Sequence, residues 1–206
     1  MTSKINKKAR HQIMTDITSE PQFDNFFALF EQPVQFEINQ SNLEQRLRLL
    51  QKRFHPDNVA KNQTDMVQAQ LQSEKASALI NQAYQTLSAP DSRAGYLLDM
   101  ADQAQNIEHS IADLDFLEDA MQMRMDLDDA IEDKDLVALQ QLHPQITNRL
   151  ANQSERFNNA YQNQDWQTAI DATQKLKFLV KLNADVTSGL DDVANSSHSD
   201  DDDLYV

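Results

Sequence analysis

Apolar residues recur at helical spacing through most of this chain, and the first regular stripe lies between residues 41 and 54. Its members, spaced four, three and four residues apart, are Leu43, Leu47, Leu50 and Phe54. This period places all of them on one face of an amphipathic helix. Ser41 and Glu44 match a capping box, which predicts that the helix begins at Ser41. Pro56 cannot donate a backbone hydrogen bond and disfavours helical geometry at His55, so we expect the helix to end before Pro56.

Two further helices are predicted on either side of this stripe. Residues 24–30 form a short helix with aromatic residues on its apolar side, which Pro33 closes. A longer helix is predicted to begin near Thr64 or Asp65 and to end at about Leu87. Its apolar positions at helical spacing are Ala76, Ile80, Ala83, Tyr84 and Leu87. This face can pack antiparallel on the earlier stripe, so we expect a helical hairpin that carries a His-Pro-Asp sequence at its tip.

The segment from residue 113 to residue 133 carries two apolar arcs instead of one. At 100° per residue, the core arc consists of Phe116, Ala120, Met123, Leu127, Ala130 and Ile131. The second arc, interleaved with Glu118 and Asp128, consists of Leu114, Leu117, Met121 and Met125. A helix at the edge of a small bundle cannot easily bury both arcs, and unbranched methionine adapts to an imperfectly fitted surface, so the second arc predicts a partner-binding surface. The alternative is that these residues close against the first part of the chain or against one another.

Two more helices complete the second half. The first has its apolar positions at Leu136, Leu139, Leu142, Ile146 and Leu150. Pro144 would kink or divide this helix unless it lies near a restart, and the sequence leaves these possibilities open. Asp165 is a good N-cap for the second, whose inward face consists of Trp166, Ala169, Ile170, Thr173, Leu176 and Val180. Phe178 points well away from that face and is therefore a candidate for the exposed surface.

Composition narrows the fold class and the chemistry. With only 2 Gly and 5 Pro in 206 residues, the chain favours long helices, and we expect an all-α protein. It contains no Cys, which excludes disulfides, thiolate nucleophiles and cysteine ligation of zinc or iron–sulfur clusters within this chain. No apolar run approaches the roughly 20 residues of a membrane span, and the N-terminus lacks the apolar core of a signal peptide. We therefore expect a soluble cytoplasmic protein without membrane contact.

The charge is unevenly distributed. The net charge of -15 argues against general nucleic-acid binding, because a duplex would repel the chain. Residues 43–61 are locally positive, with five basic side chains against two acidic ones. Residues 99–135 reverse this balance, with thirteen acidic side chains against two basic ones, Arg124 and Lys134. The two halves should therefore have different partners.

The ends of the chain are expected to lack regular structure. Residues 1–22 are a basic extension with little apolar periodicity, for which a transit peptide is a less favoured alternative, and residues 191–206 are an acidic tail.

Three segments of the first half together resemble a J-domain, the module through which co-chaperones activate DnaK-type ATPase chaperones. Residues 47–57 read Leu-Arg-Leu-Leu-Gln-Lys-Arg-Phe-His-Pro-Asp, and residues 80–87 read Ile-Asn-Gln-Ala-Tyr-Gln-Thr-Leu. The third segment has Pro90 followed by Arg-Ala-Gly-Tyr-Leu-Leu at residues 93–98. With an acidic helical second half, the chain is similar to the HscB-type co-chaperones of iron–sulfur cluster assembly over about residues 23–188.

The resemblance implies a domain plan. A J-domain helical hairpin would occupy residues 23–98, a connection residues 99–112, and an acidic antiparallel three-helix bundle residues 113–190. Stimulation of the partner ATPase would fall on His55, Pro56 and Asp57.

Local chemistry agrees with this role for the tripeptide. His55 and Asp57 flank a residue of fixed φ, so both polar groups are displayed with little freedom, which suits docking better than catalysis. The basic side chains that would steer the encounter are Arg46, Arg48, Lys52 and Arg53. The alternative is a plain hairpin in which Asp57 caps the following helix and the basic face is merely solvated.

The same resemblance assigns the second apolar arc. HscB-like proteins use apolar positions matching Leu117, Met121 and Phe178 to hold the iron–sulfur cluster scaffold protein. The candidate scaffold-binding set is completed by Leu114, Met125 and Asp129. Gln122 and Met125 stand where the family usually has carboxylates, whereas Asp129 keeps one, so the electrostatic part of scaffold binding is in question.

The leading hypothesis is an adaptor that needs no cofactor and performs no chemistry. It would bind an IscU-like scaffold, deliver it to an HscA-like chaperone of the DnaK type and stimulate that chaperone's ATPase. A general J-protein that presents unfolded clients is the alternative; it fits less well because the chain has neither a Gly/Phe-rich linker nor a cysteine-rich zinc region. A third hypothesis, a hydrolase or metalloenzyme using carboxylates of residues 113–135 with His109 or His143, has no Glu-x-x-His pair and no phosphate-binding glycine loop to support it.

Overall fold

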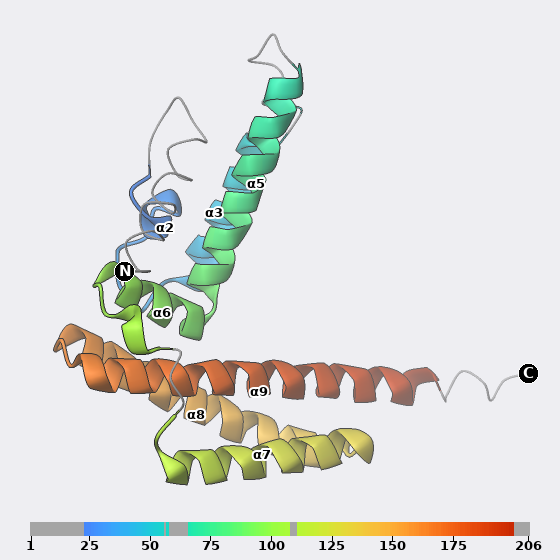
Figure 1. Cartoon of the computed structure of the whole chain (residues 1–206). Helices are drawn as coiled ribbons and strands as arrows, with labels where there is room; N and C mark the ends of the chain where they lie inside the picture. The colour runs from blue at the N-terminus through green and yellow to red at the C-terminus, as the bar shows by residue number, and fades with distance from the viewer. Residues whose placement is uncertain (1–22, 56, 58–65, 108–110, 200–206) are drawn as a thin grey trace, which may run out of the picture. The chain divides into compact units, whose positions relative to one another are not determined.

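The computed structural model describes residues 23–55, 57, 66–107 and 111–199, and all regular structure in these ranges is helical (Figure 1). The chain divides into two compact units, Met1–Gln105 and Asn106–Val206. The all-α prediction is confirmed. In the described ranges, no helix combines the length and the apolar character needed to cross a bilayer.

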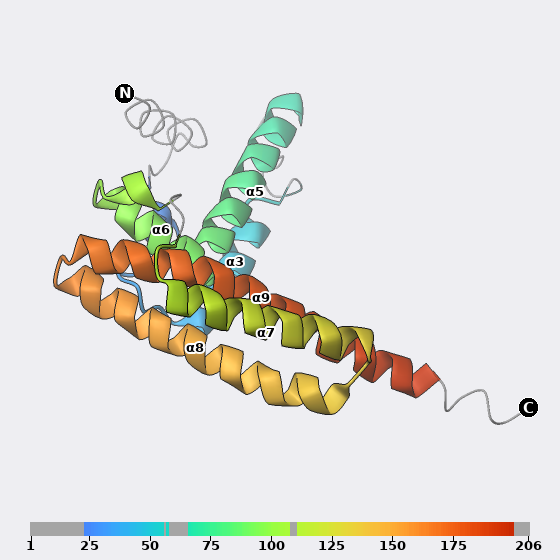
Figure 2. The ribbon, with the colours of Figure 1, turned by 60° about the horizontal axis from the view of Figure 1, so that its bottom comes forward.

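The first unit contains four α-helices in its described part: α2 (Phe26–Leu29), α3 (Gln40–Arg53), α5 (Met66–Ser88) and α6 (Pro90–Met100). Helices α3 and α5 pack side by side, and the predicted stripe faces that contact, with Leu43 and Leu50 fully buried and Leu47 and Phe54 half-buried (Figures 1 and 2). From the other elements, the core receives Phe27, Phe30, Ile80, Ala83, Leu87 and Leu97.

The predicted starts of two helices are wrong by one or two residues. Helix α3 begins at Gln40, because the Asn39 side chain already accepts a hydrogen bond from the Asn42 N–H at 3.0 Å, and asparagine is as good an N-cap as serine. The capping box at Ser41 is therefore not used. Helix α2, by contrast, begins later than predicted, at Phe26 after an Asn25 cap. The predicted start of the long helix lies outside the described residues.

Buried Arg93 joins α6 to the end of α5. Its guanidinium donates to the Leu87 carbonyl and, at 3.4 Å, to the Ser88 carbonyl, so it satisfies carbonyls that the helix end leaves open. The same group lies 4.9 Å above the Phe36 ring. Burial lowers the pKa of Arg93 to about 10, while Asp91 acts in the opposite direction. Arg93 therefore stays charged at neutral pH and acts as a structural residue of the first unit.

Tyr96 anchors the short first helix. Its ring stacks on Phe26 with a centroid distance of 4.8 Å, and its hydroxyl accepts a hydrogen bond from the Phe26 N–H at 3.0 Å. A helix of four residues cannot stand alone, so this tertiary anchor explains why α2 forms.

A short 3₁₀ turn, η1 (Ala104–Asn106), precedes the three helices of the second unit: α7 (Leu114–Glu132), α8 (Leu136–Gln162) and α9 (Trp166–Ser199). Helices α8 and α9 pack along most of their length, and α7 lies along both with fewer contacts (Figures 1 and 2). Their shared core contains Met123, Leu127, Leu139, Leu142, Ile146, Leu179, Leu182 and Val186. The predicted three-helix bundle is confirmed.

Pro144 does not divide its helix: α8 runs through it without interruption. Proline removes one helical hydrogen bond, but the flanking Leu142 and Ile146 are both buried in the bundle core and hold the two halves in register. Ile131, predicted for the core face, is 38% exposed.

The predicted C-terminal boundary at residue 190 is wrong, because α9 continues to Ser199. Leu190 and Val193 continue the apolar spacing of the helix, and Val193 is buried. Residues 191–199 therefore belong to a helix instead of a disordered tail. The basic extension, residues 1–22, and the final residues 200–206 lie outside the described ranges.

Candidate functional site

The His-Pro-Asp loop begins directly after α3 and is fixed at its base. Phe54 is the C-cap residue of α3, and its N–H donates to the Leu50 carbonyl at 3.0 Å. The Ser73 hydroxyl of α5 donates to the Phe54 carbonyl at 2.6 Å, and Ser73 is only 1% exposed. This cross-helix bond holds the base of the loop against α5.

The side chains of both polar members of the tripeptide are accessible. The side chains of His55 and Asp57 are 59% and 84% exposed. The Asp57 N–H donates to His55 Nδ1 at 3.4 Å, and the Asp57 carboxylate lies 3.6 Å from the same nitrogen. Because Nδ1 faces Asp57, the Nε2 side of the imidazole remains for an external partner. Pro56 lies outside the described residues. The loop thus presents an imidazole and a carboxylate side by side.

The four basic residues of α3 divide into two kinds. Arg48, Lys52 and Arg53 are exposed, and the Arg53 guanidinium lies 5.5 Å above the Phe54 ring. Arg46 is different: its side chain is 19% exposed and forms an ion pair with Glu31 at 2.8 Å. Its Nε also donates to the carbonyl of Leu29, the last residue of α2, at 3.4 Å. Arg46 faces α2 and joins two elements of the fold, so it is less accessible to a partner than the other three, and its place in the chaperone-binding face stays a prediction.

We predict that Ser73→Ala destabilises the base of the loop without touching its surface. The substitution removes the donor to the buried Phe54 carbonyl and should lower the free energy of unfolding by about 1–2 kcal/mol. Amide hydrogen exchange in α3 and α5 measures this within the first unit alone. Thr86→Ala is the matched control, because the Thr86 hydroxyl bonds back to the Gln82 carbonyl inside α5. Equal protection in the two variants would contradict the prediction.

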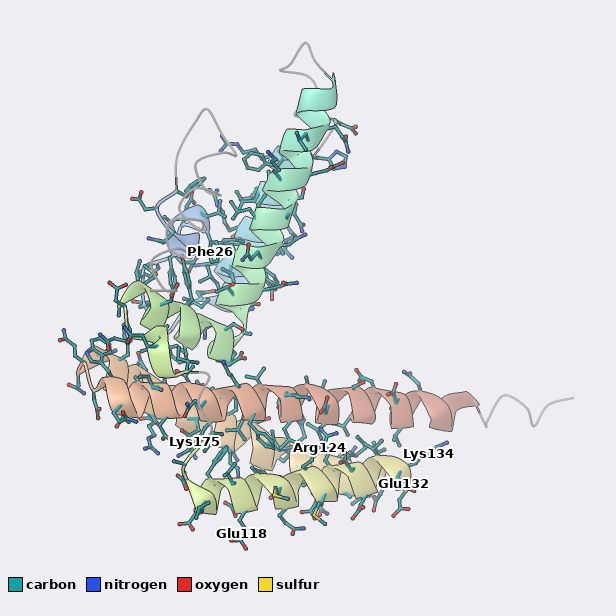
Figure 3. All side chains as sticks on the ribbon, viewed as in Figure 1. Phe26, Glu118, Arg124, Glu132, Lys134 and Lys175 are labelled. Atoms are coloured by element: carbon teal, nitrogen blue, oxygen red, sulfur yellow. The ribbon has the colours of Figure 1, made fainter. Side chains whose placement is uncertain are left out.

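The second candidate site is an apolar stripe on α7, made of Leu114, Leu117, Met121 and Met125, hereafter the α7 stripe. Leu114, Met121 and Met125 are 77%, 67% and 57% exposed, and Leu117 is half-buried. In Figure 3, Glu118 points away from the other two helices on this side of α7. Scattered exposed apolar residues are ordinary, but three large ones on one helical face form a patch suited to a partner. The stripe coincides with the second apolar arc of the sequence.

Phe178 is not on the exposed surface that its helical position predicted. It is half-buried, packs on the bundle core and meets Phe116 edge to face, with ring centroids 6.2 Å apart. Phe116 itself belongs to the first turn of α7, so Phe178 packs against the start of that helix. The helical projection missed this because it treated α9 alone.

The polar candidates beside the stripe lie on the surface. Asp129 and Gln122 are both exposed, and the Gln122 amide donates to Asp126 at 2.7 Å.

Ion pairs hold α7 to its neighbours. Arg124 pairs with Asp128 at 2.9 Å on its own helix and with Asp185 of α9 (Figure 3). Its hydrogen bonds to these two carboxylates, of which that to Asp128 contributes most, raise its pKa. Arg149 of α8 pairs with Asp119 at 2.6 Å. Sequence reasoning counted Arg124 only as an exception in an acidic segment and missed its bridging role; its spacing of four from Asp128 was the available signal.

The metalloenzyme hypothesis gains no support from the described ranges. Among those residues, no three His, Cys, Asp or Glu side chains are grouped so that they could hold a metal ion. His143 is half-buried on α8, and His109 lies outside the described residues.

Comparison with known proteins gives the family. A family model described as the HSCB C-terminal oligomerisation domain matches residues 112–187, from the start of α7 to well within α9. The co-chaperone protein HscB homolog of Acinetobacter baumannii (strain SDF) is 34% identical over 175 residues, which cover 85% of this chain and 95% of that protein. The homolog of Photobacterium profundum is 37% identical over 164 residues, covering 79% and 94%. This chain belongs to the HscB co-chaperone family.

Solved structures agree with the HscB assignment. Chaperone HscB from Vibrio cholerae is 34% identical, with a TM-score of 0.66, and the match covers 82% of this chain and 99% of that one. Human co-chaperone HscB, at 22% identity, shares the fold, with a TM-score of 0.64 over 82% of this chain and 86% of its own. The J-domain and the C-terminal bundle expected from the sequence are therefore those of an HscB protein.

Proposed function

We propose that this HscB-family protein carries an iron–sulfur cluster scaffold protein of the IscU type to a DnaK-type, HscA-like chaperone and stimulates that chaperone's ATPase. The observation that carries the proposal is the presence of two accessible recognition surfaces on separately packed units. One is the His55–Asp57 loop of the J-domain, and the other is the α7 stripe of the bundle.

The first surface suits a polar, charge-assisted contact. An exposed Asp57 carboxylate can form a bidentate pair with an arginine of the chaperone, and the outward nitrogen of His55 can donate or accept beside it. The exposed Arg48, Lys52 and Arg53 add positive charge along the same helix and attract an acidic partner face. In this proposal these groups bind the chaperone and carry out no chemistry of their own.

The second surface suits a folded partner with an apolar face. Methionine and leucine form its centre, and the carboxylates of Glu118, Asp128 and Asp129 lie around it. Gln122 and Met125 replace carboxylates that the family usually has, so apolar contact should contribute a larger share of the binding here. Cluster chemistry would be supplied entirely by the partners, since this chain has no Cys. We propose a cytoplasmic adaptor that has no catalytic residue, cofactor or nucleic-acid partner of its own.

A reconstitution tests the proposal. The DnaK-type chaperone and the scaffold protein from the same organism are purified, and steady-state ATP hydrolysis is measured with this protein, with the scaffold, and with both. We expect stimulation by this protein alone, further stimulation when both are present, and direct binding of the folded scaffold. Binding only to a pool of unfolded peptides would instead support the general J-protein alternative.

We predict that Arg48→Ala slows association with the chaperone, whereas Arg46→Ala lowers the stability of the first unit. Arg48 is exposed, so its loss should slow association with the chaperone severalfold without changing stability. Loss of Arg46 removes the Glu31 pair and should cost about 1 kcal/mol of stability. Stopped-flow association and hydrogen exchange of the first unit measure the two effects. An association rate that falls only in Arg46→Ala would show that the steering face has been placed wrongly.

A further inference from the structure

Lys175 is the most deeply buried charged side chain among the described residues. It lies in the N-terminal third of α9, between the buried Ala172 and Leu179, and is only 2% exposed. A buried ammonium group is costly unless carboxylates surround it closely. Its position in the sequence follows the apolar spacing of α9, where an apolar side chain would be expected. Lys175 is part of neither of the two candidate binding surfaces described above.

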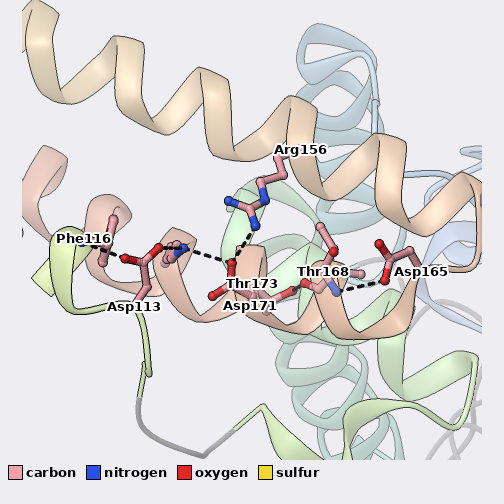
Figure 4. A network of polar contacts seen from close by, with 9 residues as sticks. Asp113, Phe116, Arg156, Asp165, Thr168, Asp171 and Thr173 are labelled. Carbon is pink, nitrogen blue, oxygen red and sulfur yellow. Dashed lines mark hydrogen bonds and ion pairs between the residues drawn. The ribbon is translucent and has the colours of Figure 1, made fainter.

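The lysine is balanced by two carboxylates from different elements. Its Nζ lies 2.6 Å from Asp113 Oδ2 and 3.0 Å from Asp171 Oδ2. Asp171 also pairs with Arg156 of α8, at 3.2 Å, so two positive and two negative groups form one network (Figure 4). The Lys175 ammonium is also 5.4 Å from the centre of the Phe116 ring. The network therefore connects α8, α9 and the residue that precedes α7.

Asp113 uses both carboxylate oxygens. Oδ1 accepts the Phe116 N–H at 3.0 Å and caps α7, while Oδ2 accepts a hydrogen bond from Lys175. The hydrogen bond from Lys175, followed by that from the Phe116 N–H, holds the pKa of Asp113 below its usual value. A helix N-terminus has N–H groups without helical partners. Asp113 accepts a hydrogen bond from one of these groups in α7, and Asp113 is itself bound by the buried Lys175.

The α7 stripe begins next to this Asp113–Lys175 pair. Leu114 follows Asp113 directly, and the Leu117 N–H donates to the Asp113 carbonyl at 3.1 Å. The ion pairs farther along α7 are made by Arg124 and Arg149, whose side chains are 41% exposed. At the start of α7, the buried Lys175 makes the corresponding ion pair. Since apolar replacement of a buried ion pair often leaves stability unchanged, stability alone is a weak reason for a lysine at this position.

Building on the proposed function, we infer that Lys175 is a positioning residue for scaffold binding. Through Asp113 it fixes the first turn of α7 and holds Leu114 and Leu117 in the arrangement that the scaffold protein contacts. Because this turn is already ordered when the protein folds, binding the scaffold does not carry the entropic cost of ordering it.

Two substitutions in the full-length protein test the inference. Lys175→Met keeps the length of the side chain and leaves Asp171 paired with Arg156. Asp113→Asn keeps a good N-cap while removing the charge that faces Lys175. The matched control is Asp135→Asn, since exposed Asp135 caps α8 in the same way, accepting the Ala138 N–H at 3.0 Å. Amide exchange at Phe116 and Leu117 is compared with exchange at Leu127 in the middle of α7, and scaffold affinity is measured by calorimetry.

We expect both Lys175→Met and Asp113→Asn to accelerate exchange in the first turn only and to weaken scaffold binding by about tenfold, with chaperone stimulation in the absence of scaffold unchanged. Asp135→Asn should change none of these. Unchanged exchange, exchange that rises along all of α7, or unchanged affinity would each overturn the inference. A wild-type protein that does not bind the scaffold contradicts the proposed function as well, whereas a wild-type protein that binds with the same affinity as the variants contradicts the inference alone.

Discussion

Replacing His55 with glutamine is expected to abolish stimulation of the partner ATPase while leaving scaffold binding intact. The His55 side chain is 59% exposed, so the fold should not change. Glutamine keeps a polar group of similar reach but loses the planar ring whose Nδ1 is oriented by the Asp57 N–H. We expect stimulation to fall at least about tenfold, which corresponds to about 1.4 kcal/mol of binding or activation free energy.

Steady-state ATP hydrolysis by the DnaK-type chaperone measures this effect, with scaffold affinity as the second readout. His143→Gln makes the same chemical change on α8, in the other unit, and should leave stimulation at the wild-type value. Full stimulation by His55→Gln would show that the loop is not the docking element, and the proposed mechanism would then fail at its first step.

Met121→Asp is expected to weaken scaffold binding by about 2–4 kcal/mol, the range seen when the centre of an interface is disrupted. Met121 is 67% exposed, so the change does not open a cavity in the bundle. The new carboxylate would have to be desolvated beneath the scaffold, next to the like charge of Glu118. Calorimetric titration of the scaffold protein measures the loss, and basal stimulation of the chaperone should persist.

Val137→Asp is the matched control for this prediction, because Val137 is 61% exposed and lies on α8, outside the α7 stripe. If both variants bind the scaffold as tightly as the wild type, the scaffold does not use the stripe. Phe178→Ala should also weaken binding, but Phe178 packs edge to face on Phe116 and contacts the bundle core. Its loss should therefore lower stability as well, so Met121 is the cleaner position for testing the surface.

Local patterns predicted those features of the molecule that depend on one helix at a time. Leu43 and Leu50 are buried because the period of the stripe places them on one face, and the same reasoning identified Met121 and Met125 as exposed. The end of α3 before the His-Pro-Asp sequence also follows from local chemistry, since Pro56 disfavours helical geometry at His55.

Features that depend on a second element could not be read from the sequence in this way. Arg46 and Arg48 carry the same charge two residues apart, and only the position of α2 makes one structural and leaves the other exposed. Phe178 is half-buried because Phe116, far from it in sequence, meets its ring. Lys175 follows the apolar spacing of α9, but the partner that balances its charge, Asp113, lies far from it in sequence. Each of these outcomes is set by a tertiary contact that helical periodicity does not encode.

The contrast between the attachments of α7 has a consequence for its behaviour at different ionic strengths. Mobile ions screen pairs that water reaches, such as those of Arg124 and Arg149, whose side chains are 41% exposed. They have little access to Lys175, which is 2% exposed. Added salt should therefore weaken the attachment of α7 at Asp119 and Arg124, while the first turn, which carries Leu114 and Leu117, keeps its link to Lys175. The protein should thus keep the first part of its partner surface in order even in concentrated salt.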